Sequence, residues 1–102
     1  MKTFLLTKPA ERDPDQIKAF LVQRAGARVA RRVMEDIRSA LGLLSKEPGV
    51  GHRREDLTSR PLRFWPVYSY LIVYDPETTP VQILRVLHGM RTRRDSELMA
   101  QS

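Results

Sequence analysis

Three side chains in the second half of the chain have the chemistry needed to cleave or hold a phosphodiester: Arg63, Arg85 and His88. RNA cleavage through the ribose 2′-hydroxyl needs groups that move protons, and cations that stabilise the charge developing on the phosphate. His88 could carry a proton and the two arginines could supply the cations. The set is incomplete, because His52 is distant in the sequence and no second proton carrier is obvious. A histidine at a strand end is also commonly structural.

A wider basic surface includes the same residues. We expect the sheet face opposite the helices to present Arg63, Trp65, Arg85 and His88, followed by Arg91, Arg93 and Arg94. Arginines interleaved with an aromatic ring can hold phosphates and stack a base. In the alternative interpretation the aromatic residues belong to the core and the arginines form a solvated rim. We predict that these seven residues contact a target or a partner protein.

Composition restricts the classes of function. The 102 residues carry a net charge of +6 and no cysteine. A chain this short is expected to form one domain, residues 1–102, and its charge favours an acidic partner. The lack of cysteine excludes disulfides and thiolate metal sites, and the two histidines with no paired carboxylates predict neither a metal nor another cofactor. No stretch approaches the roughly 20 apolar residues that span a bilayer, so we expect a cytoplasmic protein without a membrane partner.

Two helices are expected in the first half of the chain. A brief strand at 2–7 precedes Asp13, which has the spacing of a helix cap, and Pro14 would then occupy the first helical position. The first helix is predicted over 14–25, where Gly26 ends it. The second follows almost at once and ends before Pro48. Its apolar stripe comprises Val29, Val33, Ile37, Ala40, Leu41 and Leu44.

The segment 52–61 is polar and reads as a connector, anchored by Leu57. Strands are predicted at about 62–66, 68–74 and 81–87, and the last two are joined by the Pro-containing turn 75–80. Apolar residues on both faces of the middle strand suggest an interior position, with Tyr68, Tyr70, Ile72 and Tyr74 sharing one face.

In the last strand, alternation places Val81, Ile83, Arg85 and Leu87 on one face. Arg85 is a cation in this otherwise apolar set, so it needs a partner or an opening to solvent.

The predicted order, β-α-α-β-β-β, indicates an α+β fold with a helical hairpin on a small, mostly antiparallel four-stranded sheet. The pattern leaves open where the 2–7 strand joins the sheet. A short C-terminal helix from about residue 95, with Leu98 and Met99 docking, is one alternative for the tail, and a frayed end is the other.

The chain resembles the ParE branch of the RelE/ParE toxin superfamily, and the resemblance covers nearly its whole length. The residues that carry it are Arg63-Phe64-Trp65-Pro66-Val67, Tyr70-Leu71-Ile72-Val73-Tyr74, Ile83-Leu84-Arg85-Val86-Leu87-His88-Gly89 and the upstream pattern Leu41, Leu44, Pro48, Gly51, Arg54, Asp56-Leu57. The ending Arg-Val-Leu-His-Gly is the most specific piece. After Gly89 this chain departs from the family pattern, with Met90 and an added basic run before Asp95.

The resemblance implies the toxin of a type II toxin–antitoxin system, bound as a hetero-oligomer by a small antitoxin with an acidic segment. ParE-like members are associated with poisoning of DNA gyrase and have no established hydrolytic site, so the resemblance favours a toxin that is not an enzyme. RelE-like members cleave mRNA on the ribosome, which is the alternative for Arg63, Arg85 and His88. The absence of any tyrosine after Tyr74 counts against it. A relative that binds antitoxin without being toxic is the third alternative.

Overall fold

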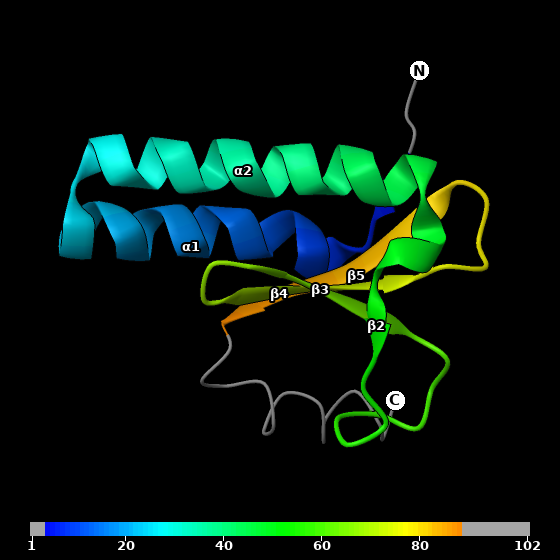
Figure 1. The fold of residues 1–102 in the computed structure, drawn as a ribbon. Helices are drawn as coiled ribbons and strands as arrows, with labels where there is room; N and C mark the ends of the chain where they lie inside the picture. Colours follow the sequence, from blue (N-terminus) through cyan, green and yellow to red (C-terminus); the bar gives the residue numbers. More distant parts are fainter. Residues whose placement is uncertain (1–3, 89–102) are drawn as a thin grey trace.

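The computed structural model describes residues 4–88, in which two helices lie side by side on one face of a sheet (Figure 1). The elements are β1 (Phe4–Leu6), α1 (Lys8–Ala25), α2 (Ala27–Lys46), the 3-10 turn η1 (Pro48–Val50), β2 (His52–Arg53), β3 (Arg63–Val67), β4 (Tyr70–Asp75) and β5 (Val81–His88). The predicted α+β class and the helical hairpin are therefore confirmed. The predicted C-terminal helix and the residues Arg91, Arg93 and Arg94 lie outside the described residues.

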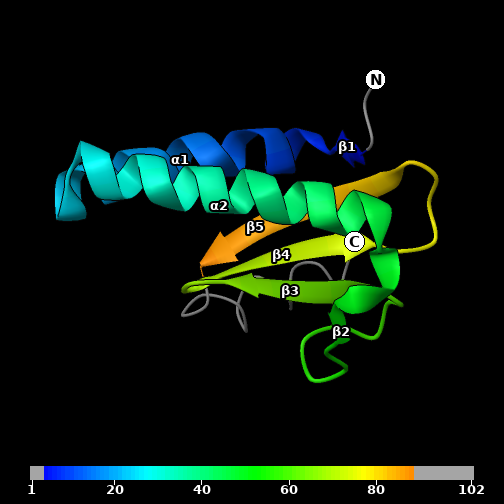
Figure 2. The ribbon, with the colours of Figure 1, turned by 45° about the horizontal axis from the view of Figure 1, so that its top comes forward.

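The described sheet has five strands in the order β1-β5-β4-β3-β2. β1 runs parallel to β5, with Phe4 opposite Val81, and all other neighbours are antiparallel (Figure 2). The prediction of four strands was wrong, because His52 and Arg53 of the supposed connector pair with β3. A two-residue strand has too few positions to show an alternating pattern in the sequence.

Helix α1 begins earlier than predicted. Thr7 caps it, since the Thr7 hydroxyl accepts a hydrogen bond from the Ala10 backbone N–H at 3.3 Å, and Pro9 lies in the first turn. Pro14 consequently lies inside the helix and Asp13 is not the cap. The predicted end is confirmed: Gly26, with a φ of +92°, stops α1 after Ala25.

Asp13 instead joins α1 to an irregularity in β5. The pairing with β4 shifts between Ile83 and Arg85, which leaves Leu84 as the extra residue of a bulge. The Thr7 hydroxyl donates to the Leu84 carbonyl at 2.8 Å, and the Asp13 carboxylate accepts from the Val86 N–H at 2.8 Å. Two polar side chains of the α1 region thus satisfy backbone groups at the bulge.

The bulge also overturns the predicted alternation of β5. Val81, Ile83 and Val86 belong to the core beneath the helices, whereas Leu84 and Leu87 belong to the core on the other sheet face. One extra residue exchanges the two faces for every position after it, so Leu87 does not share a face with Ile83.

The core between helices and sheet includes most of the apolar stripe predicted for α2. Val33, Ile37 and Leu44 are buried against Ile72 and Tyr74 of β4, while Val29 is 45% exposed. On the opposite face the segment before β3 covers the sheet through residues that include the predicted anchor Leu57. β4 has apolar contacts on both faces and lies inside the sheet, as predicted. Neither described helix is long and apolar enough to cross a membrane.

Candidate functional site

Three of the four predicted site residues within 4–88, namely Arg63, Trp65 and His88, face the helices, which contradicts the predicted placement. Arg63 pairs with Tyr74 and Trp65 with Ile72, and both partners lie in the core beneath the helices. Residues opposite each other in a ladder point to the same side of the sheet. His88 pairs with Tyr70 and also contacts Phe20 of α1.

The structure does not bring the predicted nuclease set together. Arg63 lies opposite Tyr74 near one end of β4, and His88 lies opposite Tyr70 at the other end. Four residues of strand separate these positions, which is about 13 Å. Arg63 and His88 therefore lie too far apart to hold the same phosphate directly.

Arg85 forms an ion pair with Asp13, which confirms the prediction that this cation needs a partner or an opening to solvent. Its Nε and Nη2 atoms donate to the two carboxylate oxygens of Asp13 at 2.8 and 3.1 Å. The Asp13 side chain is 7% exposed and that of Arg85 is 33% exposed. This ion pair neutralises the cation and fixes α1 to β5, which is a structural role. Within residues 4–88, no three acidic or histidine side chains form a group that could hold a metal ion.

At one end of β4 the molecule is closed by hydrogen bonds. The Tyr74 hydroxyl donates to the Pro48 carbonyl at 2.6 Å and accepts from the Gly51 N–H at 2.9 Å. Arg63 Nη1 donates to the Gly51 carbonyl at 2.7 Å. Burial raises the pKa of Tyr74, while the Gly51 hydrogen bond and the Arg63 charge oppose that rise. We call this region, formed by residues 48–51, Arg63 and Tyr74, the closed end.

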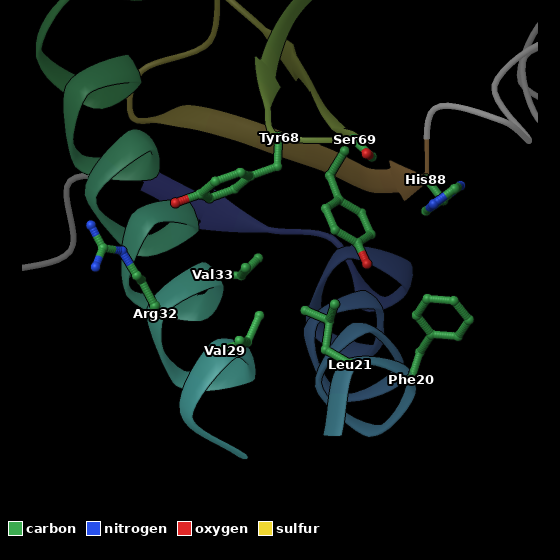
Figure 3. A pocket seen from close by; sticks show the side chains of 9 residues that line it. Phe20, Leu21, Val29, Arg32, Val33, Tyr68, Ser69 and His88 are labelled. Carbon is green, nitrogen blue, oxygen red and sulfur yellow. The ribbon is translucent and has the colours of Figure 1, made fainter. Parts of the chain in front are cut away.

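At the other end of β4 the helices and the sheet leave an apolar groove of about 430 Å³ (Figure 3). Its walls come from the facing ends of both helices, the β3–β4 turn and the last residue of β5. The lining residues are Phe20 and Leu21 of α1, Val29, Arg32 and Val33 of α2, and Tyr68, Ser69, Tyr70 and His88. We refer to this feature as the groove.

Exposed apolar side chains distinguish the groove from the core. Phe20 and Val29 are each 45% exposed, and Tyr68 is 62% exposed. His88 packs edge-on against Phe20 and Tyr70, with ring centroids 6.2 and 5.3 Å apart, and Arg24 lies over the Phe20 ring at 5.1 Å. Of the groove residues, sequence reasoning selected only His88 as a site residue. Val29 belongs to the apolar stripe predicted for the second helix, so its pattern indicated core.

Tyr68 reaches from the β3–β4 turn to helix α2 (Figure 3). Its hydroxyl donates a hydrogen bond to the Asp36 carboxylate. That bond raises the pKa of Tyr68, and the nearby charge of Arg32 opposes the effect. The groove therefore combines apolar walls with arginine and carboxylate groups at its rim.

Comparison with known proteins identifies the fold and the family. The family model described as the ParE toxin of the type II toxin–antitoxin system parDE matches residues 4–93. The chain belongs to the ParE toxin family. Toxin ParE3 of Caulobacter vibrioides is 32% identical over 90 residues, which cover 87% of this chain and 88% of that relative.

A solved chain from the chromosomal ParDE TA system of P. aeruginosa has a similar fold. Its TM-score is 0.70 at 22% identity, and the match covers 86% of this chain and 96% of that chain. The resemblance that residues 63–67, 70–74 and 83–89 carry is thus confirmed, and the chain is a ParE toxin of a type II toxin–antitoxin system.

Proposed function

We propose that this ParE toxin acts in the cytoplasm by binding and inhibiting DNA gyrase, and not by cleaving RNA. The supporting observation is the geometry of the predicted nuclease set. Arg63 and His88 lie at opposite ends of β4, and Arg85 is held by the Asp13 carboxylate. Proton transfer and charge stabilisation in phosphodiester cleavage need groups within hydrogen-bond reach of one phosphate. Inhibition by binding has no such requirement.

We further propose that the groove receives the antitoxin. Its apolar walls suit the apolar face of an amphipathic segment, since helices and extended peptides bind in grooves of this kind. Arg32 lines the groove and Arg24 lies over Phe20 beside it. The chain as a whole carries a net charge of +6. An antitoxin segment with aliphatic side chains flanked by acidic residues would match both features.

The experiment that tests the gyrase proposal uses toxin released from its co-expressed complex with the antitoxin. Purified toxin is added to gyrase and relaxed plasmid, and separately to a translating extract that contains a reporter mRNA. We expect loss of supercoiling, restored by added antitoxin, and an intact mRNA. Cleaved mRNA with normal supercoiling would overturn the gyrase proposal in favour of the ribonuclease.

Variants of the same residues sharpen the result. Arg63→Ala and His88→Ala should each abolish mRNA cleavage if the toxin is a ribonuclease. Under the gyrase proposal, the folded Arg63→Ala variant should still inhibit supercoiling as the wild-type toxin does, because Arg63 has a structural role: it donates to the Gly51 carbonyl at the closed end. Circular dichroism and thermal unfolding of each variant provide the folding control.

A further inference from the structure

The turn between β3 and β4 contains an unusual residue. Val67 pairs with Tyr70, so Tyr68 and Ser69 alone form the turn. Tyr68 has a φ of +56°, and among residues 4–88 no other non-glycine residue has a positive φ. Two-residue hairpin turns need this conformation and favour glycine or asparagine for it. A bulky side chain there is strained, and such strain gathers at functional sites.

Polar contacts with helix α2, to Asp36 and to Arg32, tie this strained residue to the rest of the molecule. The Tyr68 hydroxyl donates to Asp36 of α2, whereas the ring is 62% exposed. Core packing therefore does little to hold Tyr68. The ring lines the groove together with Arg32 and Val33, which lie on α2 within one turn of Asp36. The hydrogen bond thus joins the sheet wall of the groove to its helical wall.

We propose that Tyr68 is a positioning residue of the groove: its hydrogen bond to Asp36 holds the strained β3–β4 turn so that the groove is open before a partner binds. Glycine would satisfy the turn at a lower conformational cost. The tyrosine is therefore explained by the groove and not by the hairpin. The identity of the partner rests on the proposed function, whereas the positioning role concerns the free toxin.

The first test uses the free toxin. Tyr68→Phe removes the hydroxyl and keeps the ring, and Asp36→Ala removes the acceptor. We expect both variants to show new microsecond-to-millisecond exchange in NMR relaxation dispersion at residues 67–70 and 29–36. Asp36→Asn keeps an acceptor oxygen and should resemble the wild type. Tyr70→Phe removes a hydroxyl from the same groove and is the matched control. Unchanged exchange in Tyr68→Phe would overturn the proposal.

The second test measures binding kinetics with the purified cognate antitoxin. A groove that is open for less of the time lowers the association rate by that fraction. We expect Tyr68→Phe to slow association about three- to tenfold, the range that one hydrogen bond supports. Dissociation should be unchanged. Faster dissociation with unchanged association would make Tyr68 an ordinary contact residue and overturn the positioning role. The double variant Tyr68→Phe/Asp36→Ala should associate no more slowly than either single variant, because each substitution removes the same hydrogen bond.

Tyr68→Gly separates positioning from folding. It removes the backbone strain along with the ring, so the melting temperature should stay the same or rise while antitoxin association slows. A large fall in melting temperature would show that Tyr68 serves the fold, which overturns the proposal. If wild-type toxin does not bind the antitoxin, the groove proposal fails, but the NMR test on the free toxin still decides the role of Tyr68.

Discussion

Each end of β4 has a tyrosine whose hydroxyl forms a hydrogen bond, but one tyrosine is buried and the other is exposed. At the closed end the Tyr74 hydroxyl is satisfied by Pro48 and Gly51, and the side chain has no exposed surface. At the groove end Tyr68 is mostly exposed and bonds to Asp36. At the closed end the hydrogen bonds of Tyr74 leave no open space, whereas at the groove end the hydrogen bond of Tyr68 leaves the groove unfilled. The chemistry of tyrosine alone therefore does not decide whether a site is core or surface.

The largest effect should come from filling the closed end. A Cβ at Gly51 would lie 2.4 Å from the Tyr74 hydroxyl oxygen and 2.8 Å from a ring carbon. Gly51→Ala should therefore cost about 2–3 kcal/mol in the free energy of unfolding, measured by urea titration. Gly49→Ala is the matched control, because a Cβ at Gly49 meets nothing within 4 Å. Equal stability of the two variants would show that the closed end is not tightly packed.

Removing the hydroxyl at the closed end should have a somewhat smaller effect. Tyr74→Phe leaves the Gly51 N–H and the Pro48 carbonyl without their partner, which should cost about 2 kcal/mol. Tyr70→Phe makes the same chemical change at the groove end. Thermal unfolding should show a clearly lower melting temperature for Tyr74→Phe than for Tyr70→Phe. The reverse order would contradict the division into a sealed and an open end.

A charge placed in the groove should affect binding and leave the fold intact. Val29→Glu puts a carboxylate into the groove, and Val22→Glu makes the same change on a side chain that is 41% exposed and does not line it. We expect Val29→Glu to weaken antitoxin binding at least about tenfold in calorimetry, because a carboxylate would replace an apolar wall of the groove and repel the acidic residues of the antitoxin. Val22→Glu should bind like the wild type. Equal losses would mean that the antitoxin binds elsewhere.

The smallest effect concerns alkaline pH. Burial raises the pKa of Tyr74 above the usual value of about 10, so the folded state keeps a proton that the unfolded state releases. The resulting stability is complete below pH of about 10 and is lost as the pH rises further. Unfolding midpoints in urea, measured between pH of about 8 and 10.5, should fall less steeply for Tyr74→Phe than for the wild type. Parallel slopes would contradict the assigned burial.

Local patterns predicted the elements that obey them. The strand around Ile72, the turn 75–80 and the end of α1 at Gly26 were all confirmed. Contacts between distant residues explain the errors. Asp13 and Pro14 have the sequence of a helix start, but Thr7 provides an earlier cap and Asp13 binds Arg85, 72 positions away.

Arg63, Trp65 and His88 were predicted on the wrong sheet face because the pairing register cannot be inferred from the sequence of any single strand. Treating Tyr68 as a strand residue hid the two-residue turn that sets Trp65 opposite Ile72. The bulge at Leu84 added a second change of face. Sequence patterns could not reveal the groove, since its walls come from four elements that only the fold brings together.

The parallel pairing of β1 with β5 also has a consequence for synthesis. β1 is synthesised before the helices, whereas its partner strand β5 is synthesised only after almost the whole described chain. β5 also supplies His88 to the groove and pairs with β4. The sheet, and with it the groove, is therefore complete only after translation has passed residue 88. A nascent toxin carries its helices well before it carries the surface that a partner would recognise.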